Sequence, residues 1–372
     1  MRWPENERST VRLVVTVERY APAIGGAERV AQRVSEGLAA RGHEVHVITG
    51  AIPGPTELNG TRIHRLPIAG NDVRGIQGDG KAVVETVDAL QPDLVFNYAA
   101  QTWATDCCLP LLEREARPRM VLAPCGFSGL GKRRYASYFA GMPTRLRRYD
   151  GLILHSTVYQ DWDFVVRAGV ERMFVIPNGA DPPAGGEMLR AQIAGGSIAV
   201  TVGSHVCTKG HRDFARATRS LGRQRSLTGV IVAPERHGLD SLRGCQLACR
   251  SRARMRGERL RVLDGAAPGT VADALATATL FLFTSRVECA PLVILEAMAA
   301  STPWVSYDVG NVSELPGGLV ARDYEELLDL AEQILDGVHP ELGTQGHEAW
   351  NANHRWEQII ARYESVFEEL LA

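Results

Sequence analysis

Residues 280–315 have the sequence LFLFTSRVECAPLVILEAMAASTPWVSYDVGNVSEL and carry the strongest fold signal of the chain. The first apolar run ends at Ser285 and is typical of a buried parallel strand, because such strands are continuously hydrophobic instead of alternating. A helix is expected over residues 291–300 and another strand over residues 304–308. This order of strand, helix and strand indicates one unit of a doubly wound α/β sheet.

The same alternation recurs along the rest of the chain and predicts two domains. A chain of 372 residues exceeds the size that one hydrophobic core usually reaches, and the turn-rich residues 178–186 indicate a linker. Further strands are expected at residues 11–17, 44–50, 93–96, 120–123, 151–155 and 174–177 before the linker, and at 197–203, 229–234 and 260–265 after it. Ligands of such sheets bind beyond the carboxyl ends of the strands, so we expect two doubly wound, Rossmann-like domains that face each other across a cleft.

The charge balance argues against a general affinity for nucleic acid. Lys and Arg total 41 against 43 for Asp and Glu, which gives a net charge of −2. One local basic run with interleaved aromatic residues fits either a solvated helix face or a surface for an anionic acceptor or a membrane. This run comprises Lys132, Arg133, Arg134, Arg145, Arg147 and Arg148.

The cysteines and the apolar segments favour a cytoplasmic protein and leave open a peripheral position at the inner face of the membrane. The seven cysteines are odd in number and show no repeated spacing, which is typical of reduced thiols. Cys245 and Cys249 have no second Cys or His pair nearby in the sequence, so a structural role is favoured over a metal site. The polar N-terminus predicts no signal peptide, and no apolar run is long enough to predict a transmembrane helix.

Two carboxylates flank the start of the helix expected over residues 291–300. Glu288 lies in the loop before it, Glu296 lies one to two turns into it, and Pro291 suits its first turn. The first amides of a helix lack partners and attract anions, above all phosphates. A nucleotide sugar, which has hydroxyl-rich ends and an anionic middle, fits this layout, although two exposed Glu at a helix edge would look the same. The amides concerned belong to Ala290, Leu292 and Val293.

The whole segment closely resembles the signature of retaining GT-B glycosyltransferases, above all glycosyltransferase family 4 (glycosyl transferases group 1). The resemblance implies that Glu288 contacts hydroxyls of the transferred sugar and that Glu296 holds the ribose of the nucleotide. Two departures, Ala290 in place of an aromatic-Gly pair and Ser301 in place of Gly, affect the fit of the sugar. The matching residues are Ser285, Glu288, Pro291, Leu295, Glu296, Ala297, Met298, Ala299, Pro303, Gly310 and Glu314.

Other segments resemble the same family and complete the expected site for the sugar donor. Residues 25–49 resemble its first Gly-rich loop, although a plain turn before a helix also needs Gly. Residues 202–211 resemble its phosphate-binding loop, in which Lys209 neutralises the leaving diphosphate. The usual Arg after Gly203 is absent, and we expect His205 to replace it in part, although His is mostly neutral at pH 7. The expected binding residues are Gly25, Gly26, Gly203, Ser204, His205, Lys209, Glu288, Cys289, Ala290, Pro291, Leu292, Val293 and Glu296.

The resemblance also implies domain limits and a mechanism. We expect an acceptor-binding domain over residues 9–180, a donor domain over residues 190–350, and a C-terminal helix over residues 351–372 that crosses back to the first domain. The implied reaction moves a sugar, in the manner of a hexosyltransferase, from a nucleoside-diphosphate sugar to a hydroxyl acceptor. Attack comes on the face that the leaving group departs from, and Glu288 and Lys209 are the expected catalytic residues. No Asp-x-Asp metal signature lies in a suitable loop, so neither a metal nor another cofactor is expected.

The acceptor side is defined less well by the sequence. The family often has His-Gly where this chain has Cys125-Gly126, and a Cys is more typical of a buried core than of a base. Ser128, Tyr98 and Asn97 are further candidates for contact with a glycan, a lipid-linked group or a small molecule. The departures from the family pattern leave two alternatives open: a catalytically inactive GT-B partner protein, and another GT-B enzyme such as a sugar-phosphate synthase or an epimerase.

Overall fold

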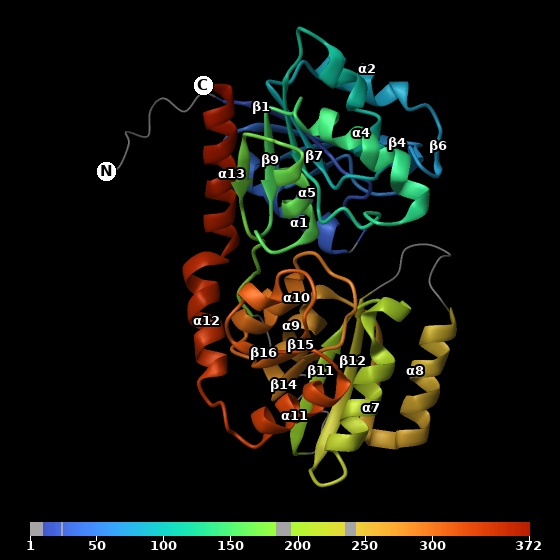
Figure 1. Cartoon of the computed structure of the whole chain (residues 1–372), viewed down its shortest axis with the longest axis vertical. Helices are drawn as coiled ribbons and strands as arrows, with labels where there is room; N and C mark the ends of the chain where they lie inside the picture. The colour runs from blue at the N-terminus through green and yellow to red at the C-terminus, as the bar shows by residue number, and fades with distance from the viewer. Residues whose placement is uncertain (1–9, 24, 184–194, 235–242) are drawn as a thin grey trace. The chain divides into compact units, whose positions relative to one another are not determined.

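The computed structural model describes residues 10–23, 25–183, 195–234 and 243–372, and it divides into two compact units (Figure 1). The first unit comprises Met1–Pro177 and Glu357–Ala372, and the second comprises Asn178–Trp356. The N-terminal segment 1–9, the linker residues 184–186 and residue 190, where we expect the donor domain to begin, lie outside the described residues.

The first unit is built on an eight-stranded sheet in the order β10-β9-β8-β7-β1-β2-β4-β3. All neighbouring strands are parallel except β3 and β4, and a separate antiparallel pair is formed by β5 and β6. The six strands expected in this half are confirmed, whereas β3 to β6 lack the apolar run that would indicate them. The strands are β1 (Arg12–Thr16), β2 (Glu44–Gly50), β3 (Glu57–Leu58), β4 (Thr61–Leu66), β5 (Ala69–Asn71), β6 (Gly75–Gln77), β7 (Leu94–Tyr98), β8 (Arg119–Ala123), β9 (Gly151–Leu154) and β10 (Met173–Val175).

The C-terminal helix α13 (Trp356–Leu371) belongs to the first unit from Glu357 onward. The absence of a side chain at Gly37 makes room for Ile360, since a Cβ at Gly37 would lie 2.2 Å from Cδ1 of Ile360. The ring of Phe96 on β7 lies 5.7 Å from that of Tyr363 and 5.4 Å from that of Phe367. The apolar face that the sequence predicts for this helix is therefore buried in its own unit. The other helices of the unit are α1 (Gly26–Ala40), α2 (Lys81–Leu90), α3 (Trp103–Asp106), α4 (Ala136–Leu146) and α5 (Gln160–Arg167), with 3-10 turns η1 (Leu109–Glu113) and η2 (Arg133–Tyr135).

The second unit holds a six-stranded parallel sheet in the order β13-β12-β11-β14-β15-β16. This is the doubly wound order in which the chain reverses its winding direction between the first and the fourth strand, here β11 and β14. The strands are β11 (Ser197–Val202), β12 (Leu227–Pro234), β13 (Leu260–Ala266), β14 (Leu280–Phe283), β15 (Trp304–Tyr307) and β16 (Gly318–Ala321). The helices are α7 (His211–Leu221), α8 (Arg243–Arg256), α9 (Pro268–Thr277), α10 (Leu292–Ala299), α11 (Tyr324–Leu335) and α12 (Leu342–Asn353), with 3-10 turns η3 (Cys207–Lys209), η4 (Gly257–Arg259) and η5 (Val312–Glu314).

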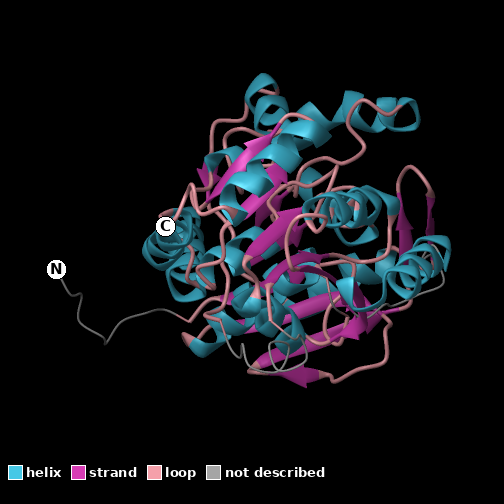
Figure 2. Ribbon diagram, turned by 90° about the horizontal axis from the view of Figure 1, so that it is seen from below, coloured by secondary structure: helices cyan, strands magenta, loops and turns pink. Residues whose placement is uncertain are grey.

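Helices cover both faces of this second sheet (Figures 1 and 2). One core joins α9, α10 and α12 to residues such as Val200 and Phe281, and the other joins α7, α8 and α11 to Ala199 and Leu280. Neighbouring residues of a strand point to opposite faces, so β11 and β14 contribute to both cores in alternation. The expected α/β class with two Rossmann-like sheets is confirmed.

None of the helices in the described part of the chain combines the length and the apolar character needed to cross a membrane.

Candidate functional site

The switch in winding direction between β11 and β14 positions two of the expected site residues. The two strands are direct neighbours in the sheet. Loops that leave the carboxyl ends of such strands in opposite directions form the usual ligand crevice of a doubly wound sheet. Lys209, the last residue of η3, lies in the connection after β11, and Glu288 lies in the connection after β14.

Lys209, Glu288 and Ser285 form one hydrogen-bonded cluster at this point. Nζ of Lys209 donates to Oε1 of Glu288 at 2.6 Å, and Oγ of Ser285 donates to the same oxygen at 2.5 Å. The side chains of Lys209 and Glu288 are 27% and 14% exposed, so they are shielded in part yet open to solvent. An ion pair in such a position attracts more strongly than one on an open surface. The two expected catalytic residues are thus brought together within one unit.

Backbone contacts fix the two connections to each other. The amide of Arg286 donates to the carbonyl of Thr208 at 2.7 Å, and Oγ1 of Thr284 donates to the carbonyl of Lys209 at 3.3 Å. Gly210 has a φ of +67°, and a Cβ at this position would lie 1.9 Å from the carbonyl oxygen of Thr284. Only glycine combines this backbone conformation with so close an approach. The residue that follows Lys209 therefore has to be Gly for the loops to meet in this way.

Gly203 packs against the side chain of Lys209. A Cβ at Gly203 would lie 3.2–3.3 Å from the Cβ, Cγ and Cδ atoms of Lys209, so the aliphatic stem of the lysine lies directly over this glycine. The next residue, Ser204, is exposed and occupies the place of the family's usual Arg. Lys209 is therefore the positive side chain that this loop directs toward Glu288.

The helix α10 begins one residue later than the sequence predicts. Pro291 has an extended ψ of 114° and caps the helix instead of forming its first turn, and its carbonyl accepts from the amide of Ile294 at 3.3 Å. The expectation that Pro291 lies inside the helix is therefore wrong by one position, because its backbone has already left the helical region. The amides of Leu292 and Val293 still lie in the first turn of the helix, at the positive end of its dipole.

The segments around the start of α10 are held by further contacts. Nδ2 of Asn178 donates to the carbonyl of Ala290 at 3.0 Å. Gly310 has a φ of +60° and approaches Cys289 so closely that a Cβ would lie 2.3 Å from its carbonyl oxygen. Cys289, Ala290, Leu292, Val293 and Glu296 are all half-buried, and Glu296 lies one turn into the helix. The expected residues of this segment thus line one rigid loop-and-helix start.

His205 does not have the position that the sequence predicts for it. Its side chain is 1% exposed, and Nε2 lies 2.5 Å from Oδ1 of Asp264. An imidazole held in this way cannot replace the missing Arg toward a phosphate, because its ring is turned into the protein. His205 lies beside His211, Cys245 and Cys249 instead, and the ligand atoms of the four lie within 4.8 Å of one another. Burial and the nearby His205 lower the pKa of His211 to about 4, so its ring is neutral.

The Gly pair of the first unit lies at the start of α1. Gly25 caps this helix with a fully extended backbone, and Gly26 is its first residue. A Cβ at Gly25 would lie 2.2 Å from Oε2 of Glu28, whose side chain is buried and paired with Arg19 at 2.8 Å. The backbone of Gly25 is one that any residue adopts, and the group that a side chain here would meet is the carboxylate of Glu28. Gly26 is exposed, and none of the described residues outside its own helix lies within 4 Å of a Cβ placed on it.

The acceptor candidates gather around a buried histidine that the sequence analysis did not single out. Nε2 of His155 lies 3.3 Å from the hydroxyl of Tyr98 and 3.8 Å from Sγ of Cys125, and its Nδ1 lies 3.0 Å from the carbonyl of Ile176. Burial lowers the pKa of His155 and raises that of Cys125 to about 12, so the imidazole and the thiol are both neutral. The imidazole is a base and the thiol is not. The sequence signal for His155 is its position directly after β9, at the carboxyl end of a parallel strand.

Gly126 and Ser128 complete this region. Gly126 has a φ of +94°, its amide donates to Asp161 at 2.9 Å and its carbonyl accepts from Gln160 at 2.6 Å. Ser128 is exposed, whereas Asn97 is buried and its amide donates to Thr16 at 2.7 Å. The structure therefore keeps Ser128 accessible and places Asn97 in the core.

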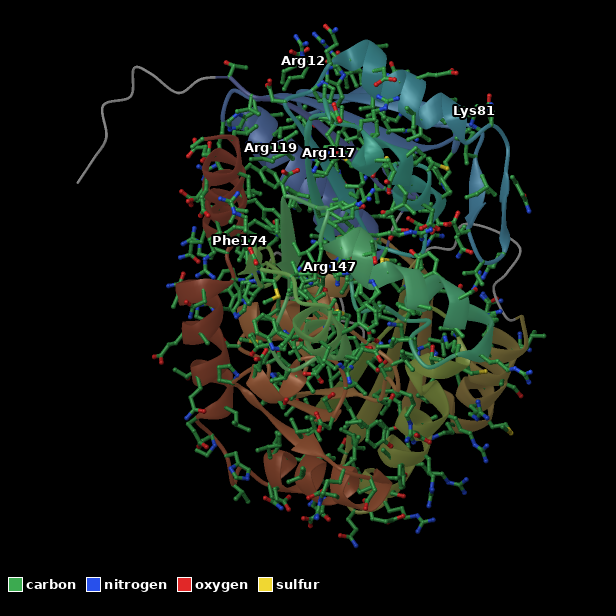
Figure 3. The ribbon with its side chains drawn as sticks, turned by 45° about the horizontal axis from the view of Figure 1, so that its top comes forward. Arg12, Lys81, Arg117, Arg119, Arg147 and Phe174 are labelled. Carbon is green, nitrogen blue, oxygen red and sulfur yellow. The ribbon has the colours of Figure 1, made fainter. Side chains whose placement is uncertain are left out.

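Three of the six residues of the basic run, Arg145, Arg147 and Arg148, are paired within the first unit. Nη1 of Arg147, labelled in Figure 3, donates to the carbonyl of Ala168 at 2.7 Å. Arg145 lies 3.7 Å from Asp72, and Arg148 forms an ion pair with Glu113. At these three positions the contacts favour a surface that is satisfied by its own neighbours, whereas Lys132, Arg133 and Arg134 are exposed to solvent.

Comparisons with known proteins agree with the geometry. The model of the Glycosyltransferase Family 4 matches residues 24–183, and that of the Glycosyl transferases group 1 matches residues 196–337. A stretch of 119 residues is 31% identical to N-acetyl-alpha-D-glucosaminyl L-malate synthase of Bacillus anthracis, covering 30% of this chain and 31% of that protein. This match therefore spans less than a third of the relative's length.

Solved structures share the fold over nearly the whole chain. Sucrose-phosphate synthase from Thermosynechococcus elongatus matches with a TM-score of 0.81 and 17% identity over 97% of this chain and 99% of that one. HepE of Anabaena, solved in complex with UDP and glucose, matches with a TM-score of 0.76 and 16% identity over 96% and 100%. Such low identities show the fold alone. These structures show that the chain has the GT-B fold, and the two family models, which match residues 24–183 and 196–337, show that it belongs to the family 4 and group 1 glycosyltransferases.

Proposed function

We propose that the chain is a retaining glycosyltransferase that moves a sugar from a nucleoside-diphosphate sugar to a hydroxyl acceptor without a catalytic metal. The observation that supports this most directly is the pairing of Lys209 with Glu288 at the switch point, beside the start of α10. An ammonium group and helix-start amides suit a diphosphate, and a carboxylate suits the hydroxyls of a sugar.

In the proposed reaction, the bond between the anomeric carbon and the diphosphate oxygen breaks while the acceptor oxygen bonds to the same face of that carbon. The acceptor proton passes to the departing phosphate oxygen, so the step balances without a protein nucleophile. Negative charge grows on the diphosphate, and Lys209 together with the amides of Leu292 and Val293 offsets it. Lys has three N–H donors, and its bond to Glu288 uses one of them. The ammonium group is thus held in place with donors left for a phosphate.

The roles of the two Glu residues follow the same division. We assign the hydroxyls of the transferred sugar to Glu288 and the ribose of the nucleotide to Glu296. Two similar proteins guide the choice of the sugar donor: HepE was solved with UDP and glucose, and the Bacillus anthracis relative is named for an N-acetylglucosaminyl group. UDP-glucose and UDP-N-acetylglucosamine are therefore the first donors to examine.

We place the acceptor in the first unit, beyond the carboxyl ends of β7, β8 and β9. Tyr98, Cys125, Gly126 and Ser128 belong to this region, and His155 is the basic group nearest to Tyr98 and Cys125. A hydroxyl of a glycan, a lipid-linked group or a small molecule meets the chemical requirement equally well.

The test incubates the chain with a panel of nucleoside-diphosphate sugars in buffer without added divalent cation. Turnover is measured as release of the nucleoside diphosphate. We expect at least one donor to be consumed and the product to keep the anomeric configuration of the donor. An inverted product overturns the retaining mechanism, and a requirement for added Mg²⁺ or Mn²⁺ overturns metal-independent departure. Nucleotide binding by calorimetry without turnover supports an inactive GT-B partner protein instead, and release of an unattached epimerised sugar supports an epimerase.

We further propose a cytoplasmic position with peripheral contact to an anionic membrane, carried by the second unit. A surface hollow of about 710 Å³ in the first unit mixes Arg side chains with carboxylates, among them Asp150. Asp150 pairs with Arg117 and Arg119, both labelled in Figure 3. A hollow of about 950 Å³ between α7 and α8 is lined instead by seven Arg residues with Ala215, Gly222 and Met255. These are Arg212, Arg216, Arg219, Arg223, Arg252, Arg256 and Arg259. Such a surface attracts anionic lipid headgroups.

A further inference from the structure

A cluster of two histidines and two cysteines lies in the second unit and takes no part in the proposed transfer. Its ligand atoms, one each from His205, His211, Cys245 and Cys249, are all within 4.8 Å of one another. His205 and His211 stand on either side of η3, while Cys245 and Cys249 stand one turn apart on α8 and so share one face of that helix. Two segments that are separate in the sequence thus direct four metal-binding groups to one place.

Both histidines are buried, and one nitrogen of His205 lacks a partner. The side chains of His205, His211 and Cys249 are only 1–2% exposed. Nδ1 of His205 finds no hydrogen-bond partner among the described residues. A buried polar atom left without a partner costs about 1–3 kcal/mol, so Nδ1 of His205 points to a ligand that satisfies it.

The distances within the cluster suit a tetrahedral metal. Nδ1 of His211 lies 3.8 Å from Sγ of Cys249. Tetrahedral zinc, with bonds of about 2.3 Å to sulfur and about 2.0–2.1 Å to nitrogen, holds its ligand atoms roughly 3.3–3.8 Å apart. The cluster, whose atoms lie within 4.8 Å, needs to contract by only about 1 Å to reach that geometry.

The surroundings of His205 match the outer shell of a metal site. Nε2 of His205 lies 2.5 Å from Oδ1 of Asp264, which leaves the unpartnered Nδ1 as the nitrogen that can bind a metal. The second oxygen of Asp264 accepts from Gln246 at 3.0 Å and from Arg250 at 2.6 Å. Metal-binding imidazoles usually donate their other N–H to such a carboxylate, which fixes the ring and strengthens the ligand. Gln246 and Arg250 each follow one of the two cysteines directly, so α8 supplies both the thiols and the brace.

We propose that His205, His211, Cys245 and Cys249 bind one zinc ion in a closed structural site. Two thiolates and two imidazoles form a ligand set that favours zinc, and four protein ligands leave no position for an activated water. The two thiolates also balance the charge of the ion in this buried place. The ion would tie α8 to both ends of η3, the turn that ends in Lys209. The proposal rests on the geometry of the cluster and is independent of the proposed transfer reaction.

The experiment measures zinc bound to the full chain, produced without a polyhistidine tag, reduced, loaded with Zn²⁺ and desalted. We expect about one zinc per chain by elemental analysis, and loss of most of it in Cys245→Ser and Cys249→Ser. Cys207→Ser is the matched control, because Cys207 is an exposed thiol of η3 outside the cluster, and it should keep its zinc. Substitution with Co²⁺ should give the absorption of a tetrahedral, thiolate-bound ion. Loaded protein with no retained zinc, or a Co²⁺ spectrum without thiolate bands, overturns the proposal.

A second measurement needs no variant and so remains decisive if a cysteine substitution prevents folding. The wild-type chain is alkylated with and without Zn²⁺, and each modified cysteine is identified by peptide mass spectrometry. We expect Zn²⁺ to protect Cys245 and Cys249 and to leave Cys207 as reactive as before. Equal alkylation of Cys245 with and without Zn²⁺ overturns the site. Neither readout depends on turnover, so a failed transfer assay leaves this result unaffected.

Discussion

Nζ of Lys209 lies 2.6 Å from Oε1 of Glu288, across 79 positions of sequence. Each residue follows a strand at the point where the parallel sheet reverses its winding, so the fold delivers both to one place. The bond fixes the flexible lysine before any ligand arrives. A cation that is already oriented stabilises developing negative charge without a reorganisation cost in the reaction.

Lys209→Ala should therefore lower kcat/KM for the sugar donor by roughly a hundredfold to a thousandfold, the usual effect of removing one preorganised charge-stabilising group. Steady-state kinetics with the best donor of the panel provide the measurement. Lys81→Ala is the control, because Lys81 is an exposed lysine at the start of α2 in the other unit (Figure 3). Equal kinetics in Lys209→Ala and Lys81→Ala would remove Lys209 from the mechanism.

Glu288→Gln tests the carboxylate separately from the lysine. The amide keeps the size of the side chain and one oxygen for Ser285 and Lys209, but it loses the charge. We expect kcat to fall at least about tenfold, while the Kd of the free nucleoside diphosphate changes by less than about threefold, because Glu288 serves the sugar and not the phosphate. Calorimetry with the diphosphate gives the second value. A parallel loss of nucleotide binding would instead assign Glu288 to the nucleotide.

Sequence and structure agree where the pattern is local and differ where distant residues decide. Long apolar runs locate β11 and β14, and the motif in residues 280–315 locates Glu288. The orientation of the His205 ring depends on Asp264, 59 positions away, and no local sequence pattern reveals that partner. For the same reason the sequence does not reveal a complete ligand set around Cys245 and Cys249. The two histidines of the cluster precede β12 in the sequence, whereas the two cysteines follow it. Pro291 caps the helix that the sequence predicts to include it, because a proline suits both the cap and the first turn.

Gly210→Ala should displace the loop that carries Lys209. The added Cβ meets the carbonyl oxygen of Thr284 in a backbone conformation with a φ of +67°. We expect a loss of about 1–3 kcal/mol in the free energy of unfolding of the second unit, together with lower activity. Gly257→Ala is the matched control, since Gly257 also has a positive φ, of +57°, but no atom of the described part of the chain meets its added Cβ within 4 Å. If both variants lose stability equally, strain alone explains the effect and the contact with Thr284 is unimportant.

The Arg-lined hollow between α7 and α8 should bind anionic vesicles. Met255 on α8 lines this hollow, is exposed and adds apolar contact to the charge. Each Arg near an anionic surface contributes about 1 kcal/mol, so a variant without Arg219, Arg223 and Arg252 should bind roughly a hundredfold more weakly. Sedimentation with phosphatidylserine vesicles at low and high salt measures this, with neutral vesicles as reference. Arg225→Ala is the control, because Arg225 is already paired with Asp336 at 2.6 Å. Binding that is insensitive to salt and to the Arg substitutions would contradict this role.

Asp106 gives the first unit a stability that depends on pH. Its buried carboxylate accepts from the amide of Asp72 at 3.0 Å and from the hydroxyl of Tyr138 at 2.9 Å, yet burial raises its pKa from 3.8 to about 6. The folded chain therefore holds this proton more tightly than the unfolded chain does. The stability that the proton provides is complete below pH 3.8 and is lost as the pH rises through about 6. The whole change corresponds to about 3 kcal/mol, since one pKa unit is worth about 1.4 kcal/mol.

Asp106→Asn should remove this dependence, because an amide carries no charge at either pH. We expect an imperfect hydrogen bond to lower the free energy of unfolding of the variant by about 1 kcal/mol at every pH. Between pH 4 and pH 7 the free energy of unfolding of the wild type falls, so the stability of the variant relative to the wild type rises steadily. Hydrogen exchange of β7 and α3 amides reports the opening of the first unit separately from the second. Asp163→Asn, at an exposed position on α5, controls for the loss of a carboxylate as such. If the difference between wild type and Asp106→Asn stays constant over this range, Asp106 is ionised in both states, and its burial is compensated by the two hydrogen bonds that it accepts.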